Sequence, residues 1–399
     1  MKRIASIDIF RALTMMMMIF VNDFAGMSGL PHWLGHAATE EDMLGFSDLV
    51  FPAFLFCVGL SIPYAVGARY RKGATQLQVI GHVLLRTFAL VVMGVFSMNT
   101  RGVPGGISHP VFSILTVTGY FLIWNDYPHR ADGKRPAWVR VLQALGIALL
   151  VFLVIYKDLH GMPFRHGWWG ILGLIGWAYL PCALVYVLVR GDFNKTWIFW
   201  LLSLVLCILN NLKAIPADYA SRVLLLGFWP GGWAHPAIVA TGMFVAMLLI
   251  RYGDRPSELR YLYFFTYMWM IGLGLLCHRY WIISKNLATP TWMFFSLAFA
   301  VAMFALLWWV ADEKGWTRWA RPVSPAGTAT LTCYMIPSLW YAVQQLLHLS
   351  WPAALETGIP GLVKALGFSF VIIGLTWCFT KVGLKLKISI TPCRWSRAR

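Results

Sequence analysis

The chain has 399 residues, of which 59% are hydrophobic and 12% charged, and its mean hydropathy is positive. This composition excludes a disordered chain and an ordinary soluble domain, and it indicates a polytopic membrane protein. The formal net charge is +17, but Lys and Arg cluster between apolar stretches of about 20 residues, so a membrane is the expected partner and nucleic acid is not.

Twelve apolar stretches are predicted to be membrane-spanning helices, so we expect an all-α fold of about 12 helices, with 10 as the lower bound, surrounded by the lipid bilayer. They cover roughly residues 7–26, 48–68, 76–98, 108–126, 138–157, 168–190, 196–213, 230–251, 259–281, 290–311, 326–348 and 361–386. The start, "MKR" before an apolar run, resembles a signal peptide. However, Asp8 and Arg11 interrupt the run and no small-residue cleavage site follows, which favours an uncleaved first helix.

The distribution of basic residues predicts the orientation of the chain. If the N-terminus is cytoplasmic, the inside segments together with the adjoining ends of the spans carry 23 Lys and Arg, and the outside connections counted in the same way carry eight. This excess predicts that both termini are cytoplasmic and that the turn over residues 27–47 faces outward, in a multi-pass protein of the inner membrane. We expect one transmembrane domain over residues 1–388 and a basic tail over 389–399. Seven scattered cysteines without a CxxC or CxxH spacing predict neither a disulfide framework nor a metal site.

The first predicted span carries polar residues on one helical face. Asp8, Arg11, Met15, Met18 and Asn22 follow steps of three and four residues, so they share that face. Arg11 and Asn22 are about 16 Å apart along the helix. Ionisable groups inside a span are costly, so the stripe favours the lining of a path through the bundle. The alternative is that Asp8 and Arg11 only neutralise each other near the membrane surface.

In the third predicted span His82 and Arg86 share a face, because they are four residues apart. The planar guanidinium of Arg86 suits phosphate recognition, since it donates several hydrogen bonds. A salt bridge to a neighbouring helix, for example to Asp8, is the competing interpretation.

The turn "GLPHWLGHAATEEDML", residues 29–44, is unusually polar for a connection between two apolar helices. It contains His32, Trp33 and His36, and the ends of the flanking helices place Asn22 and Asp48 beside it. A histidine held by a carboxylate can act as a general base, and an amide can stabilise a developing oxyanion. The alternative for the histidines is a solvated side chain. The acidic run Glu40, Glu41 and Asp42 is either a solvated face or a patch for a cationic acceptor.

The stretches "RIASIDIFRALTMMMMIFVND", "GH" and "DLVFPAFLFCVGLSI" resemble the heparan-α-glucosaminide N-acetyltransferase family of membrane acyltransferases. The blocks "LLRTFALVVMGV", "SKNLATPTW", "VADEKGW" and "PAGTATLTCY" extend the resemblance over most of the chain. It implies acetyl transfer across a membrane, from cytosolic acetyl-CoA to an amino sugar or glycan on the far side. The catalytic positions of the family fall on His36, Asn22 and Asp48.

The implied donor site uses Arg11, Arg86 and His82 at the cytoplasmic side, where the arginines would hold the phosphates of coenzyme A. On the outer side, Lys285, Asn286 and Trp33 are candidates for binding the sugar; a structural connector and a membrane anchor are the alternatives. No metal is expected, and a homodimer stays open. A transporter of an amino sugar or another small solute is the main rival function. An O-acyltransferase of envelope glycans shares the mechanism and differs in its acceptor.

Overall fold

The computed structural model describes residues 4–128, 136–212 and 229–388. In these ranges the chain is helical and has no β-strand, which confirms the all-α prediction. Each of the twelve predicted stretches is occupied by one long helix. These are α1 (Ala5–Phe24), α2 (Phe46–Arg71), α3 (Gln76–Met98), α4 (His109–Trp124), α5 (Ala137–Leu159), α6 (Gly170–Leu188), α7 (Phe193–Asn210), α10 (Ala234–Tyr252), α11 (Pro256–His278), α12 (Pro290–Trp308), α14 (Thr330–Leu346) and α15 (Gly358–Lys381).

Ten of these helices are long and apolar enough to cross a membrane, with α12 counted together with the π-helical turn η2 (Trp309–Glu313) that continues it. The helices α4 and α14 have 16 and 17 residues and are short for a spanning segment. The structure thus confirms a polytopic membrane protein. The count of twelve spans and the orientation of the termini stay predictions.

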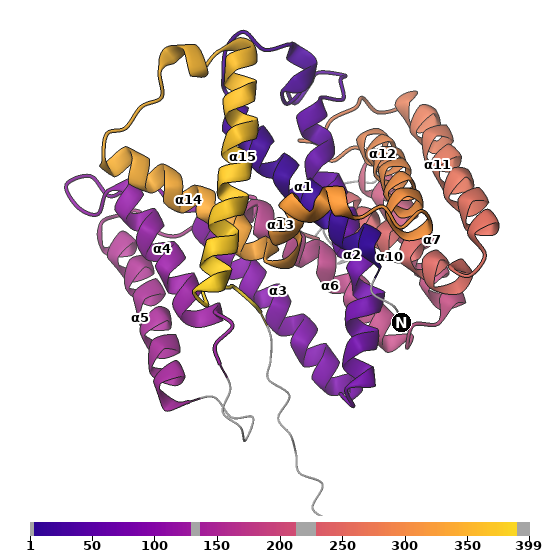
Figure 1. Cartoon of the computed structure of the whole chain (residues 1–399), viewed down its shortest axis with the longest axis horizontal. Helices are drawn as coiled ribbons and strands as arrows, with labels where there is room; N and C mark the ends of the chain where they lie inside the picture. The colour runs from indigo at the N-terminus through magenta and orange to yellow at the C-terminus, as the bar shows by residue number, and fades with distance from the viewer. Residues whose placement is uncertain (1–3, 129–135, 213–228, 389–399) are drawn as a thin grey trace, which may run out of the picture.

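The helices α1, α2 and α10 form the centre of the bundle (Figure 1). The helix α10 is buried along nearly its whole length, whereas α5 and α11 leave most of their apolar surface exposed. Exposed apolar faces on outer helices are what a bilayer would cover. In Figure 1 the start of α1 and the α2–α3 turn lie below, and the connection between α1 and α2 lies at the top.

Two glycines allow α2 and α10 to cross in close contact. A Cβ atom added to Gly59 would lie 2.0 Å from the carbonyl oxygen of Val239, and one added to Gly242 would lie 2.0 Å from that of Phe56. Small residues at such crossings let helix backbones approach, which is the usual way membrane helices gain packing energy. The crossing fixes α2, which carries both Asp48 and a wall of the central cavity described below.

The chain is broken before α14. A short helix, α13 (Ser324–Thr328), ends at Ala329, where the backbone leaves helical geometry. Gly327 lets α13 pack against α1, because a Cβ there would lie 2.7 Å from the carbonyl oxygen of Asp8. Unwound backbone at membrane depth is tolerated where it lines a cavity.

The π-helical turn η2 holds the beginning of α1. The carboxylate of Asp312 accepts hydrogen bonds from the backbone amides of Ala5 at 2.8 Å and Ser6 at 3.1 Å. The first amides of a helix have no partner within it, and a carboxylate there also interacts favourably with the helix dipole. The block "VADEKGW" therefore has a structural task, which is to anchor α1 below the cavity.

Candidate active site

His36, in the turn between α1 and α2, pairs with Asp48 at the beginning of α2. We refer to this turn, which is predicted to face outward, as the outward turn. Nδ1 of His36 lies 2.7 Å from Oδ1 of Asp48, and Oδ2 of Asp48 accepts a hydrogen bond from the backbone amide of Ala37 at 3.0 Å. The Asp48 side chain is only 3% exposed, whereas that of His36 is 43% exposed. A buried carboxylate thus orients an accessible imidazole, as the sequence predicts.

The hydrogen bond fixes which ring nitrogen can act as a base. A carboxylate only accepts, so Nδ1 of His36 carries the proton, and Nε2 of the neutral ring keeps its lone pair. Gly45 permits this geometry, because a Cβ there would lie 2.2 Å from the carbonyl oxygen of Gly35 and 3.1 Å from Oδ2 of Asp48. The turn therefore closes on itself beside the carboxylate.

Lys285, from the connection between α11 and α12, completes the cluster. Its Nζ lies 3.6 Å from Oδ1 of Asp48 and 3.3 Å from Nδ1 of His36. Burial lowers the pKa of the Lys285 amine below its usual 10.5, while the Asp48 carboxylate acts in the opposite direction. The sequence places Lys285 with the sugar-binding candidates; the structure places it against the predicted catalytic pair.

The outward turn is fastened to the same α11–α12 connection. Asp42 accepts hydrogen bonds from the amide of Ile283 and from Nε2 of His278, both at 2.8 Å. Thr39 accepts hydrogen bonds from Ser284 at 2.7 Å and from the side-chain amide of Asn286 at 3.1 Å. Asn286 thus holds the turn in place, which is the connector role left open by the sequence.

The acidic run is only partly a solvated face. Glu41 pairs with Nε2 of His32 and accepts a hydrogen bond from the amide of Ala38 at 3.0 Å. Hydrogen bonds to the amides of Ala38 and Ile283 are the largest cause that lowers the pKa of Glu41 and of the Asp42 carboxyl, respectively. Only Glu40 in this run lacks a hydrogen bond among the described residues. His32 is thus occupied by Glu41, whereas His36 has a buried partner.

Two predicted site residues lie outside these contacts. Asn22 is exposed near the end of α1, and no hydrogen bond joins its side chain to His36, Asp48 or any other described residue. Trp33 is 60% exposed at the tip of the turn, in the short helix η1 (His32–Leu34). The predicted roles of Asn22 and Trp33 are contacts with a bound substrate, and their positions here do not test those roles.

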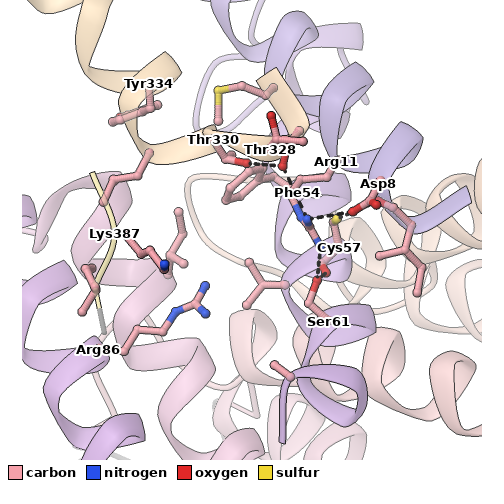
Figure 2. A pocket seen from close by; sticks show the side chains of 18 of the residues that line it. Asp8, Arg11, Phe54, Cys57, Ser61, Arg86, Thr328, Thr330, Tyr334 and Lys387 are labelled. Atoms are coloured by element: carbon pink, nitrogen blue, oxygen red, sulfur yellow. Dashed lines mark hydrogen bonds and ion pairs between the residues drawn. The ribbon is translucent and has the colours of Figure 1, made fainter. Parts of the chain in front are cut away.

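A cavity of about 640 Å³ occupies the opposite half of the bundle. Four of the five residues on the polar face of α1 line it, namely Asp8, Arg11, Met15 and Met18, and Asn22 does not. Arg11 bonds to Asp8 at 3.2 Å and to the hydroxyl of Ser61 at 2.7 Å (Figure 2). The stripe on α1 therefore lines a cavity from Asp8 to Met18, and the Asp8–Arg11 pair lies in its wall. A path through the whole bundle stays a prediction.

The inner part of this cavity is basic. Besides Arg11 it is lined by Arg71 at the end of α2, by Arg86 and by Lys387, which follows α15. Figure 2 shows Arg86 and Lys387 on one side of the cavity and Arg11 with Asp8 on the other. Asp8 pairs with Arg11, and Asp126 pairs with Lys387 at 2.9 Å. The four cations outnumber these two carboxylates, so the inner part of the cavity is attractive to an anion.

Arg86 forms no ion pair among the described residues; its guanidinium lies over the ring of Tyr179, 4.9 Å from the centroid. The competing interpretation, a salt bridge to a neighbouring helix, is therefore not observed. His82 lies behind the cavity wall, where its Nε2 is 2.6 Å from a guanidinium nitrogen of Arg69. The cavity lining thus includes Arg86 but not His82.

A layer of protein separates the cavity from the outward turn. On α2 the outermost lining residue is Phe54, six residues after Asp48 and hence about 9 Å away along the helix. Val50 and Phe51, which lie in this interval, are buried. We refer to this layer, Asp48 to Phe54 of α2 with its buried surroundings, as the septum.

A family model described as a domain of unknown function, DUF5009, matches residues 3–236. The chain belongs to this DUF5009 family. The matched range contains α1, the outward turn and α2, so it includes His36, Asp48 and most of the cavity wall.

This DUF5009 protein is also distantly homologous to heparan-alpha-glucosaminide N-acetyltransferase. It is 25% identical to the protein of that name from Mus musculus over 183 residues, which are 38% of this chain and 26% of the relative. It is 30% identical to the one from Homo sapiens over 106 residues, which are 27% of this chain and 15% of the relative. The matches therefore span about a quarter or less of these relatives, and they confirm the resemblance seen in the sequence motifs.

In this DUF5009 protein one buried charged group escaped the sequence analysis. Asp23, next to Asn22, accepts hydrogen bonds from Nζ of Lys364 at 2.9 Å and from the hydroxyl of Tyr341 at 2.8 Å. The Asp23 and Lys364 side chains are 4% and 9% exposed. Opposite charges at the same predicted end of two apolar helices were the available signal, since such groups are rarely buried without a partner.

Proposed function

We propose that the protein is a membrane-embedded acetyltransferase, which moves an acetyl group from cytosolic acetyl-CoA to an amino sugar or glycan on the outer side. The observation that carries this proposal is the accessible His36 imidazole held by the buried Asp48 carboxylate at 2.7 Å. The homology to an N-acetyltransferase supports the reaction class, and the basic cavity supports an anionic donor.

The donor would occupy the cavity from the cytoplasmic side. Phosphates of acetyl-CoA carry several negative charges, and Arg11, Arg71, Arg86 and Lys387 supply cations for them. Deeper in, Met15, Met18 and Leu90 provide an apolar lining for the thioester arm. The lining is therefore basic near the inner ends of the helices and apolar toward the septum, as the two parts of the donor require.

The chemical step needs a base at the outer end. An acceptor amine attacks the thioester carbonyl carbon and Nε2 of His36 takes its proton, which leaves an imidazolium facing Asp48. Collapse of the tetrahedral intermediate breaks the carbon–sulfur bond, and the imidazolium returns the proton to the leaving thiolate. The products are the acetylated amine and free coenzyme A. The Lys285 ammonium, beside His36, is better placed than Asn22 to stabilise the transient oxyanion.

The septum must open for this step, because the cavity ends about 9 Å from Asp48 along α2. Opening would bring the thioester to His36, either for direct transfer or for transient acetylation of the ring. A hydroxyl acceptor would use the same base, so an O-acyltransferase of envelope glycans is the second candidate.

The test is incubation of the purified protein in lipid nanodiscs with labelled acetyl-CoA and a panel of hexosamines and glycans, followed by mass analysis of the products. We expect an acetylated acceptor and free coenzyme A in equal amounts. Uptake of a solute into proteoliposomes, without any acetylated product, would contradict the proposal and support a transporter.

A further inference from the structure

A second cavity, of about 600 Å³, lies on the outer side between the end of α1, α14 and the start of α15. The ion pair of Asp23 and Lys364 and the hydroxyl of Tyr341 contribute to its lining. Gln344, Gln345, Ser28 and Thr357 add polar groups, and Trp351 adds an aromatic ring. Such a mixture of amides, hydroxyls and one indole suits a ligand rich in hydroxyl groups.

An apolar cavity of about 500 Å³ adjoins the polar one. The two share three lining residues, Gln344, Leu349 and Trp351, so only these side chains lie between them at the shared wall. On α14 the apolar cavity is lined from Ile336 to Gln344, about 12 Å along the helix, and on α15 by Leu375 and Phe379. Phe379 lies 15 residues beyond Lys364 of the polar cavity, about 22 Å along α15. The two cavities together therefore extend over more than half the thickness of a bilayer core, about 15 Å.

We propose that these two cavities form a binding site for a saccharide carried on a hydrocarbon chain, with the sugar in the polar cavity and the chain in the apolar one. A ligand with only one of these parts would leave the other cavity without a matching partner. That this site binds the acceptor of the acetyl group rests on the proposed function. That it binds a saccharide with a hydrocarbon chain rests on the two cavities alone.

The charges select the kind of head group. Asp23 and Lys364 neutralise each other, and Glu356 leaves the polar cavity with one net negative charge. Among the described residues, the Glu356 carboxylate has no hydrogen bond or ion pair, and neither has the Gln344 side chain. A free carboxylate repels a phosphate head group and attracts an ammonium, which favours an amino sugar over an anionic phospholipid.

The polar cavity is close in sequence to the outward turn. Ser28 lines the polar cavity and His36 follows eight residues later on the same connection. Eight residues span at most about 29 Å even when fully extended. A chain-bound sugar held here is therefore within one short connection of the imidazole.

The test measures binding of labelled hexadecyl β-glucosaminide and of free glucosamine to the protein in phosphatidylcholine nanodiscs. We expect the alkylated sugar to bind at least tenfold more tightly. Val343→Trp, which fills the apolar cavity, should abolish that advantage. Val363→Trp is the matched control, because Val363 is also exposed, at 65% against 46% for Val343, but lines neither cavity.

Two further arms identify the head group. Unlabelled phosphatidylglycerol and phosphatidylethanolamine should compete poorly, and Glu356→Gln should reduce the preference for hexadecyl glucosaminide over hexadecyl glucoside. Equal affinity with and without the chain, or an equal loss in both Trp variants, would overturn the proposal. Effective competition by phosphatidylglycerol would identify an ordinary lipid site and overturn it as well. Binding needs no acetyl transfer, so this result and that of the acetyltransferase assay are independent.

Discussion

Lys285 Nζ lies 3.6 Å from Oδ1 of Asp48, so the connection between α11 and α12 brings a cation to the first turn of α2. The carboxylate is thereby shared between an ammonium and the imidazole of His36. Both partners come from connections between helices, whereas Asp48 is fixed on α2. The cluster can therefore adjust to a substrate around one rigid carboxylate, and it makes several expectations testable.

His36→Ala should fold and insert normally, because the side chain is 43% exposed and its loss opens no core cavity. Acetyl transfer should fall by about 10² or more, the usual effect of removing a general base. His32→Ala is the matched control, since His32 lies in the same turn but pairs with Glu41. Product formation at saturating acetyl-CoA measures both variants. A larger loss in His32→Ala would show that the wrong histidine was chosen.

Lys285 should impose an alkaline limit on the reaction. Since burial lowers the pKa of its amine below 10.5, the ammonium loses its proton as the pH rises toward that value. If the ammonium stabilises the oxyanion, kcat should fall as the pH rises through this range, which forms the alkaline limb of the pH–kcat profile. Lys285→Arg keeps the charge and should shift the limb upward, while Lys285→Met should lower kcat at all pH values. A pH–kcat profile unchanged in Lys285→Met would contradict the role.

Arg86→Gln should weaken binding of coenzyme A, because a charge-assisted hydrogen bond to phosphate contributes about 1.5–3 kcal/mol, or roughly 10- to 150-fold in Kd. Isothermal titration in detergent measures the change, and added salt should reduce the wild-type affinity. Arg255→Gln is the control, because Arg255 is exposed, pairs with Glu258 and lies outside the cavity. Equal affinity of Arg86→Gln and wild type for coenzyme A would contradict a phosphate contact and indicate that Arg86 only packs against Tyr179.

The orientation is testable with single cysteines in a background without the seven native ones. Glu40→Cys in the outward turn should react with an impermeant thiol reagent added outside intact cells, and Lys72→Cys between α2 and α3 should not. Both positions are exposed and neither residue has a positive φ, so cysteine fits the backbone at both. The reverse pattern of labelling would invert the topology, with the donor cavity then opening outward.

Gly59→Ala should destabilise the protein by about 1–3 kcal/mol, because the added Cβ would overlap the carbonyl oxygen of Val239. Gly272→Ala on α11 is the control, since nothing lies within 4 Å of a Cβ there and alanine favours the helix. Thermal unfolding in detergent, followed by fluorescence, compares the two. A similar Tm for both variants would show that α2 and α10 do not cross closely.

Hydropathy and helical spacing predicted the elements well, because a segment that must be apolar and helical in a bilayer has few alternatives. All twelve predicted stretches contain a helix, and the polar face of α1 lines a cavity from Asp8 to Met18. The His36–Asp48 contact followed from the same logic, since a short turn brings the ends of two helices together. In each case the interaction is local in sequence.

Contacts between residues far apart in the sequence were beyond that reasoning. Lys285 reaches His36, and Lys364 reaches Asp23, only because α11, α12 and α15 pack around α1 and α2 in one particular order. Spacing along a chain does not determine that order. The same limit explains Asn22: helical periodicity placed it on the face of Arg11, but the cavity ends before it, so its oxyanion role stays a prediction.

The septum has a consequence for the energetics of the cell that holds this protein. An aqueous passage from the basic cavity to the exposed His36 would let protons leak down their gradient, since the imidazole could pick them up on one side and release them on the other. Buried side chains such as Phe51 exclude the water that such conduction requires. A variant with a permanently open septum, for example Phe51→Gly, should therefore lower the membrane potential of the cell that produces it. This effect is independent of the rate of acetyl transfer.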